Sequence, residues 1–258
     1  MASNGRRALE ITDLRVTYGS KVAVDGVSFW INQGEIFGLL GPNGAGKTST
    51  LSAIEGLVKP VSGSISVDGV DALAHGAEAR ARTGVQLQST SFQKELTIRE
   101  LVRLYSGLYG VSRSKTAADE HLSAVNLDEE AGKRFGELSG GQQKRLALLI
   151  ATVHDPLLVL LDEPTAGLDP QARRQLWERI EHMRGAGRSI LLTTHSMEEA
   201  QSVCDRVAII DHGKIVSLDT PAGLIAKHRD DPEVKRVARG EVTLEDVFIG
   251  LTGSELRD

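Results

Sequence analysis

The chain is poor in cysteine and aromatic residues, and it has no long apolar run. Cys204 is the only cysteine in 258 residues, which excludes an internal disulfide and fits a reducing compartment. Aromatic residues make up 4% of the chain, so a core must consist mainly of leucine, valine, isoleucine and alanine. The longest apolar run, Leu146 to Val153, is far shorter than the roughly 20 residues that a membrane-spanning helix needs. We therefore expect the chain to serve a membrane only through a partner.

The chain also has no excess of positive charge. Its formal net charge is −5, whereas a broad electrostatic contact with nucleic acid requires clustered lysine and arginine. The same balance argues against a polybasic membrane anchor. With 40% apolar and 25% charged residues, the composition is ordinary for one large globular domain, or for a domain with a subdomain. Residues 1–7 are polar and no apolar stretch follows them, so we expect no signal peptide.

An apolar run at 36–40 leads into a glycine-rich loop, and a plausible helix at 48–57 follows. Strand, glycine loop and helix, in this order, are the context in which the pattern G-x-x-x-x-G-K-[ST] binds phosphate. The glycines allow backbone conformations that turn consecutive N–H groups inward, and the helix N-terminus adds partial positive charge. Lys47 suits the β- and γ-phosphates, and the Thr48 hydroxyl suits Mg²⁺. A glycine turn that binds nothing would not need every fixed position of the pattern filled. The loop consists of Gly41, Pro42, Asn43, Gly44, Ala45, Gly46, Lys47 and Thr48.

Two carboxylates follow a second apolar run, at 157–161. A buried strand of this kind delivers Asp162 and Glu163 to the carboxyl edge of an open α/β sheet, where ligands bind. We expect Asp162 to hold Mg²⁺, directly or through water, and Glu163 to polarise the water that attacks the γ-phosphate, because phosphoryl transfer depends on positioning and charge neutralisation. The acids could merely end a strand, but a phosphate loop upstream favours the functional interpretation.

A second candidate anion site consists of Ser139, Gly140, Gly141 and Gln142, at the start of a predicted helix. A serine cap, free N–H groups and the helix dipole together favour an anion. The alternative is an ordinary capped helix. The chain has one lysine-bearing phosphate loop, however, and two anion sites for one nucleotide suggest that the second is offered to another subunit. A two-fold dimer would then give each nucleotide one site from each chain.

Hydrophobic periodicity predicts alternating strands and helices, with a helical stretch at about 89–156 inserted between strands. Predicted strands are 8–18, 21–31 (one or two strands), 35–40, 64–67, 83–88, 157–161, 189–193, and a hairpin of 207–210 with 215–218. Predicted helices are 48–57, 97–109, 115–125, 139–153, 170–184, 197–204, 221–228 and 243–251. The charged segment 229–235 is expected to be a surface loop.

These motifs, in this order, resemble the nucleotide-binding subunit of an ATP-binding cassette (ABC) transporter. The resemblance covers about residues 8–220, and Leu138 to Gln142 is similar to the specific signature motif of that family. It implies an α/β fold: a P-loop NTPase core with a mostly parallel sheet flanked by helices, an N-terminal antiparallel β subdomain and the inserted helical subdomain. Residues 221–258 would form a short C-terminal extension.

The resemblance also assigns roles to residues near the phosphate loop. Tyr18 is similar to the aromatic residue that stacks on adenine, although an ordinary strand aromatic is the alternative. Gln88 matches the glutamine that touches Mg²⁺ or the attacking water and couples to the membrane subunit. Gln86, on the same face of the predicted strand, is the competing candidate. Thr48 would bind Mg²⁺, and Ser49 would contact an inner phosphate.

Two further positions come from the resemblance alone. Asp169 matches the loop that contacts the opposite subunit, and His195 matches the histidine that reaches the γ-phosphate. For the other polar residues and the cysteine we expect structural roles and no part in the chemistry. The remaining histidines show no metal-ligand spacing, Cys204 is expected to be a buried apolar residue, and Lys144 and Arg145 are expected on a solvated helix face.

The implied protein is an ATPase that uses ATP and Mg²⁺ and powers transport across the cytoplasmic membrane. Segments 195–210 and 243–253 are similar to bacterial multidrug or daunorubicin-type exporter subunits, which favours export of a drug, lipid or other small molecule. Expected partners are integral membrane permease subunits and a second copy of the chain or a homologous subunit, at the cytoplasmic face of the membrane and without nucleic acid. The alternatives are a non-transport ABC ATPase acting on nucleic acid or ribosomes, and a regulatory ATP-sensing module.

Overall fold

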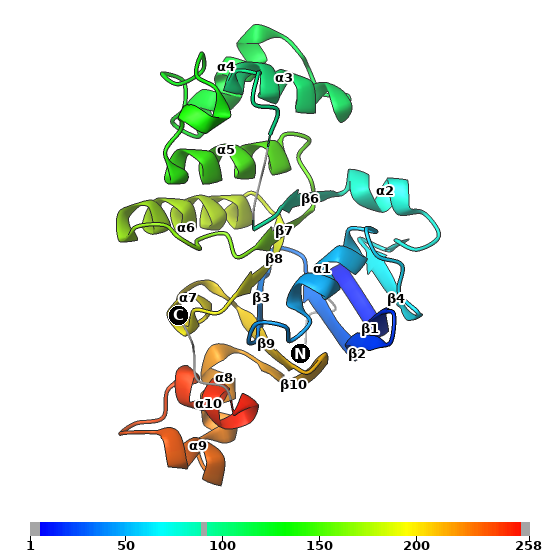
Figure 1. Ribbon diagram of the computed structural model, residues 1–258, viewed down its shortest axis with the longest axis vertical. Helices are drawn as coiled ribbons and strands as arrows, with labels where there is room; N and C mark the ends of the chain where they lie inside the picture. The colour runs from blue at the N-terminus through cyan, green and yellow to red at the C-terminus, as the bar shows by residue number, and fades with distance from the viewer. Residues whose placement is uncertain (1–5, 89–91, 254–258) are drawn as a thin grey trace.

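An antiparallel sheet forms one side of the molecule in the computed structural model, which describes residues 6–88 and 92–253 (Figure 1). Its strand order is β2-β1-β4-β5, and each neighbouring pair is antiparallel. Segment 21–31, predicted as one or two strands, is part of one long strand. The strands are β1 (Arg7–Tyr18), β2 (Lys21–Asn32), β4 (Ser62–Val67) and β5 (Val70–Asp71).

The second sheet has the order β10-β9-β3-β8-β7-β6 and is parallel except for β10. Because β3, β7 and β8 run the same way, their carboxyl ends meet at one edge, where α/β sheets bind ligands. The phosphate loop follows β3, Asp162 is the last residue of β7, and His195 follows β8. The strands are β3 (Ile36–Leu40), β6 (Thr83–Gln86), β7 (Leu158–Asp162), β8 (Ser189–Thr194), β9 (Arg206–Asp211) and β10 (Lys214–Asp219).

Strand side chains alternate between two hydrophobic cores, one on each face of the parallel sheet. On β3, Phe37 and Leu39 join the core shared with the antiparallel sheet, while Ile36 and Leu40 join the core on the opposite face. Phe37 stacks on Phe29 of the antiparallel sheet, with ring centroids 5.0 Å apart. Burial on both faces explains why these strands are continuous apolar runs in the sequence.

The helices cover both faces and extend the molecule at its two ends. Helices α3 and α4 lie at one end of the long axis and α8–α10 at the other (Figure 1). Side chains of α3, α4 and α5 form a third core of their own. Within the described residues the helices are α1 (Lys47–Ile54), α2 (Gly76–Ala81), α3 (Ile98–Leu108), α4 (Lys115–Ala124), α5 (Gly140–Thr152), α6 (Pro170–Gly185), α7 (Met197–Val203), α8 (Pro221–His228), α9 (Pro232–Val237) and α10 (Leu244–Thr252), with a 3₁₀ turn at Phe135–Glu137.

The predicted fold class is confirmed, and three local predictions need correction. Segment 229–235 is not only a loop, because Asp231 caps the short helix α9 and Val234 is fully buried. Strand β6 ends at Gln86, two residues before the predicted end. Helix α2 and strand β5 were not predicted, because elements this short show no period. The division at residue 220 stays a prediction, since side chains of α8 and α10 share one core with α6 and α7.

Candidate nucleotide site

The phosphate loop adopts a conformation that its glycines permit. Gly44 and Gly46 have φ of 83° and 112°, where residues with a Cβ are strained. A Cβ on Gly46 would lie 2.5 Å from the Ala23 carbonyl oxygen, and one on Gly41 would lie 2.4 Å from that of Ile210. The loop is therefore held against β2 and β9 by contacts that only glycine allows.

Lys47 is the first residue of α1 and is 5% exposed. Its Nζ donates hydrogen bonds to the carbonyl oxygens of Gly41 at 2.6 Å and Pro42 at 3.2 Å, so the side chain curls back over its own loop. Burial lowers the Lys47 pKa, and the nearby carboxylates of Glu163 and Asp162 oppose that shift. The first turn of α1 has no acidic residue, so its positive end remains available to an anion.

Thr193 fixes the two carboxylates at the end of β7. Its hydroxyl donates to Asp162 Oδ1 at 2.5 Å and accepts from the Glu163 N–H at 3.0 Å. Glu163 has φ of 45°, an uncommon left-handed conformation that turns its side chain away from the strand. Thr48 Oγ1 lies 3.4 Å from the other Asp162 oxygen, Oδ2. Thr193 was not predicted from the sequence.

Gln88 and His195 lie on either side of the Glu163 carboxylate. Gln88 Nε2 donates to Glu163 Oε2 at 3.2 Å, and His195 Nδ1 lies 3.5 Å from Oε1. Gln86, the competing candidate, is 1% exposed, and among the residues that the structure describes its amide nitrogen and oxygen have no hydrogen-bond partner. The geometry therefore places Gln88, and not Gln86, at the carboxylate.

A cavity of about 230 Å³ brings most of these residues together. Four predicted residues are not part of its lining: Gly41, Ala45, Asp162 and His195. Asp162 contacts the lining residue Thr48, and His195 contacts the lining residue Glu163. Lys21 and Ala23, at the start of β2, also line it, although no sequence motif marks them. The lining is Tyr18, Lys21, Ala23, Pro42, Asn43, Gly44, Gly46, Lys47, Thr48, Ser49, Gln88 and Glu163.

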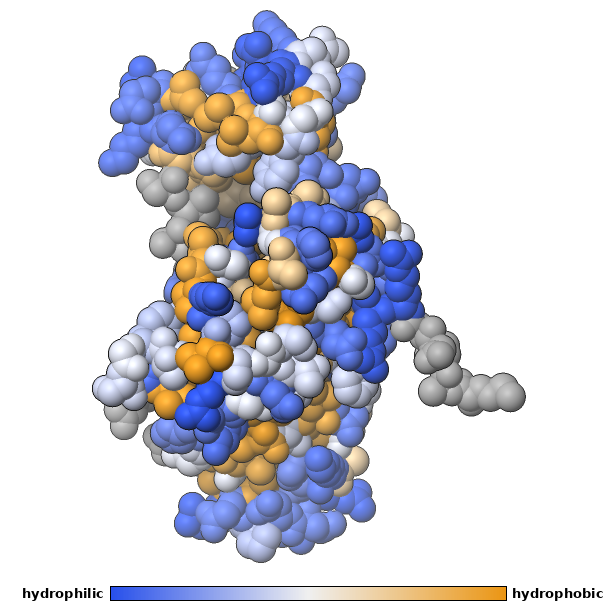
Figure 2. All heavy atoms as spheres, turned by 90° about the vertical axis from the view of Figure 1, so that its right-hand side faces the viewer, coloured by the Kyte–Doolittle hydropathy of each residue, from blue (hydrophilic) through white to orange (hydrophobic). Residues whose placement is uncertain are grey.

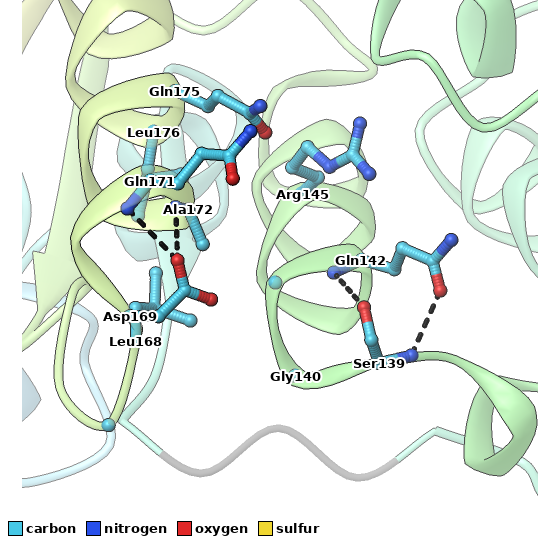
Figure 3. A pocket seen from close by; sticks show the side chains of 12 residues that line it. Ser139, Gly140, Gln142, Arg145, Leu168, Asp169, Gln171, Ala172, Gln175 and Leu176 are labelled. Carbon is cyan, nitrogen blue, oxygen red and sulfur yellow. Dashed lines mark hydrogen bonds between the residues drawn. The ribbon is translucent and has the colours of Figure 1, made fainter.

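A second cavity, of about 360 Å³, lies between the N-terminal ends of α5 and α6 (Figure 3). Ser139 caps α5 in a capping box with Gln142, and Asp169 caps α6 by accepting from the N–H groups of Gln171 and Ala172. All five of the predicted residues in this region line the cavity: Ser139, Gly140, Gly141, Gln142 and Asp169. The N-terminus of α5 opens onto this space and favours an anion there, whereas the Asp169 carboxylate already accepts from the first N–H groups of α6.

The helix that follows Ser139 corrects one expectation. Lys144 and Arg145 do not simply face solvent. Lys144 Nζ donates to the Gln88 carbonyl oxygen at 3.0 Å, and burial lowers its pKa against the attraction of Asp162 and Glu163. Arg145 donates to the carbonyl oxygens of Val125 and Asn126 and also lines the second cavity.

The donor set near the phosphate loop has the chemistry that Mg²⁺ prefers. Thr48 offers a hydroxyl and Asp162 a carboxylate, and oxygen ligands of this kind, completed by phosphate oxygens, suit Mg²⁺. Across the part of the chain that the structure describes, no cluster of three or more His, Cys, Asp or Glu side chains could hold a metal by itself. The described residues also contain no helix of the length and apolarity needed to cross a membrane.

Comparison with known proteins decides the family. The model of the family described as ABC transporter matches residues 24–166, more than half of the chain. The chain belongs to the ABC transporter family. It is an ATP-binding subunit, and its activity is ATP hydrolysis coupled to transport.

Its curated relatives are export proteins by name. A Nod factor export ATP-binding protein I of Paraburkholderia xenovorans (strain LB400) is 42% identical over 85% of this chain and 73% of the relative. The protein of the same name from Burkholderia orbicola (strain AU 1054) is 36% identical over 97% of this ABC subunit and 98% of the relative.

Solved structures give the same family. An ATP-binding subunit of an ABC transporter is 28% identical, covers 95% of this chain and 99% of its own, and has a TM-score of 0.82. An ATP-binding cassette in its ADP conformation, 23% identical over 91% of this chain and 99% of its own, shares the fold with a TM-score of 0.78.

Proposed function

We propose that this ABC subunit binds ATP between two chains and hydrolyses it to power export through separate permease subunits. The observation that carries the proposal is the pair of cavities. One holds the phosphate loop and the other the Ser139–Gln142 segment, and their described linings share no residue. In this proposal one nucleotide receives the two from different chains, and two-fold symmetry supplies two such sites at once.

The residues of the first cavity have distinct proposed roles. Lys47 leaves its two carbonyl partners for the β- and γ-phosphates, and the loop N–H groups hold the same phosphates. Tyr18, which is 49% exposed at the mouth of the cavity, stacks on adenine. Ser49 lines the same cavity and contacts an inner phosphate.

Hydrolysis is assigned to the group around Glu163. Its carboxylate polarises the attacking water, Gln88 orients that water, and His195 stabilises charge on the γ-phosphate. Thr48 and Asp162 would hold Mg²⁺ together with Gln88, and bound Mg²⁺ neutralises phosphate charge. The adjacent carboxylate, amide and imidazole support a hydrolysing enzyme over an ATP-sensing module.

The proposed permease contact lies at the end of the molecule that α3 forms. Leu104 and Leu108, four residues apart on α3, are 39% and 71% exposed, and Leu87 beyond β6 is 44% exposed. Figure 2 shows apolar side chains gathered at this end of the surface. Apolar groups exposed together favour a protein partner. Docking there would place the subunit peripherally on the cytoplasmic face of the membrane.

Export, rather than import, is supported by the names of the relatives, which are Nod factor export proteins. The cargo class that we propose is a small molecule such as a drug or lipid. ATP can shift the permease only by as much as it favours the closed dimer over the open one.

The test of this proposal is Glu163→Gln, which keeps the shape of the side chain and removes the base. We expect nucleotide binding to persist and turnover to fall by at least about 100-fold, within the range for loss of a general base. The variant should form an ATP-dependent dimer, measured by light scattering after gel filtration. The exposed Glu245→Gln is the matched control and should behave as wild type. Unimpaired hydrolysis by Glu163→Gln would remove the catalytic assignment.

A further inference from the structure

Glu199 is a buried carboxylate that the proposed chemistry does not use. It lies in the first turn of α7 and is 4% exposed. One of its oxygens, Oε1, accepts from the Thr165 hydroxyl at 2.6 Å and lies 3.6 Å from Arg173 Nε. The other, Oε2, accepts from the Thr194 hydroxyl at 2.9 Å. A single carboxylate therefore joins the end of β8 and the start of α7 to the segment 165–173, about thirty residues earlier in the sequence.

Thr165 and Arg173 both belong to the segment that borders the second cavity. The Thr165 carbonyl oxygen accepts from the Leu168 N–H at 3.1 Å, which closes the turn leading to Asp169. Asp169 caps α6, and Arg173 lies in the first turn of that helix. Leu168 and Asp169 line the cavity with Ser139. On this side, Glu199 fixes the loop that faces the nucleotide bound by the partner chain.

Thr194 belongs to the other side, the chain's own nucleotide site. It directly precedes His195, and its hydroxyl also accepts from the Ser196 N–H at 3.0 Å, which fixes the backbone on both sides of the histidine. His195 lies 3.5 Å from the Glu163 carboxylate. A change in the position of Thr194 is therefore a change in the position of His195.

The chemistry of the group makes the link stiff. The Glu199 carboxylate accepts hydrogen bonds from two hydroxyl donors, one on each oxygen, and the Arg173 guanidinium lies nearby, with its Nε at 3.6 Å. If either loop moved away alone, a charge that is almost wholly buried would lose a donor, and such a loss is costly. The two loops are thus favoured to move together.

We propose that Glu199 is a positioning residue that couples the loop around Asp169 to the loop around His195, and so couples the two ATP sites of the dimer. The inference rests on the proposed two-chain site. Closure of one site against Asp169 would place His195 correctly in the other. Because coupling between sites is reciprocal, each ATP would favour the other, and hydrolysis would depend cooperatively on ATP concentration.

The experiment is steady-state hydrolysis by the full chain across a range of ATP concentrations. For wild type we expect a Hill coefficient between about 1.5 and 2, the ceiling for two sites, and for Glu199→Gln a value of about 1. The maximal rate should fall less than about tenfold, because the catalytic groups are intact. Glu198→Gln, the exposed neighbour, should keep the wild-type coefficient.

The hydrogen bonds that Thr165 and Thr194 donate to Glu199 can be removed separately while the Glu199 carboxylate is kept. Thr165→Val and Thr194→Val should each lower the Hill coefficient to about 1, and the double variant should go no lower, since either cut breaks one link. Thr165→Ser and Thr194→Ser keep the hydroxyl and should retain cooperativity. The threonine variants decide the matter if Glu199→Gln fails to fold.

Three results would overturn the inference in distinguishable ways. A lowered Tm with an unchanged Hill coefficient in Glu199→Gln would make the residue merely structural. Turnover by wild type with a coefficient of about 1 would exclude coupling while leaving the proposed function intact. Failure of Glu163→Gln to dimerise with ATP would remove both proposals together.

Discussion

At the scale of single residues, the carboxylates of Asp162 and Glu163 depend on a hydroxyl that no motif marks. Asp162 on β7 and Thr193 on β8 are direct partners in the register of the parallel sheet. This register places one hydroxyl between the buried Asp162 carboxylate and the strained backbone of Glu163. Thr193 therefore acts on both acids without touching the nucleotide cavity.

We expect Thr193→Val to impair catalysis and stability together. Valine has the same shape but removes the hydroxyl partner of Asp162 Oδ1 and of the Glu163 N–H, which costs on the order of 1–3 kcal/mol. The turnover rate should fall more than ATP affinity, because Glu163 is displaced while the phosphate loop is intact. Chemical denaturation and ATPase kinetics measure the two effects. Thr193→Ser is the control and should restore both. An unaltered rate in Thr193→Val would show that Glu163 is held in another way.

The charged residues within the motifs could be predicted from the sequence, and the side chains that support them could not. Lys47, Asp162 and Glu163 occupy fixed offsets from glycines and strand ends, so a pattern identifies them. The bonds from Thr193 to Asp162 and from Thr165 to Glu199 each span more than thirty residues, and a single sequence contains no record of which strands are neighbours. Gln88 is intermediate, because the sequence offered two glutamines and only burial distinguishes them.

Glu55 should make stability depend on pH. Burial, and secondarily the Asp162 charge, raise its pKa from 4.5 to about 7. Since the folded state then favours the neutral acid, this stabilisation is complete below about pH 4.5 and is lost as pH rises to about 7. Glu55→Gln should therefore gain stability relative to wild type across that window, by on the order of 1–3 kcal/mol after allowance for screening. Denaturation midpoints at pH 5 and pH 8, without nucleotide or Mg²⁺, measure the gain. A constant difference between the two proteins would refute the assignment.

At the scale of elements, α5 connects the two cavities within one chain. Its N-terminus borders the second cavity, and one turn later Lys144 holds the backbone of Gln88 beside Glu163. From the sequence, Lys144 is a polar residue on an amphipathic helix, and its contact with residue 88 requires the packing of α5 against β6. Apart from the short α2 and α9, the helices were predictable because their caps and periods are local. Helix α9 was not, since one buried valine is its only apolar anchor.

Lys144→Met should reduce turnover with little effect on nucleotide affinity. Methionine keeps an apolar stem but cannot donate to the Gln88 carbonyl oxygen, so Gln88 is less well placed to orient water. Loss of one hydrogen bond of about 1 kcal/mol predicts a threefold to tenfold lower kcat. Kinetics, with nucleotide Kd measured separately, test this. Lys115→Met, on the exposed start of α4, is the matched control. A weakened Kd with unchanged kcat would show that Lys144 serves binding instead.

At the scale of the whole molecule, the two cavities predict that two inactive variants regain ATPase activity when their chains form a mixed dimer. Lys47→Ala removes the phosphate-binding charge, and Ser139→Arg blocks the second cavity, so each pure dimer should be inactive. In a mixed dimer one site receives both defects and the other receives none. Random mixing makes half of the dimers mixed, each with one of two sites intact, so activity should recover to at most about a quarter of wild type. The shortfall below a quarter measures how far one intact site depends on the other site of the same dimer.

Mixing Lys47→Ala with Glu163→Gln is the control for this experiment. Both defects lie on the phosphate-loop side, so every site is defective and no recovery is expected. If the first mixture also stays inactive although mixed dimers form, the nucleotide is not shared between chains.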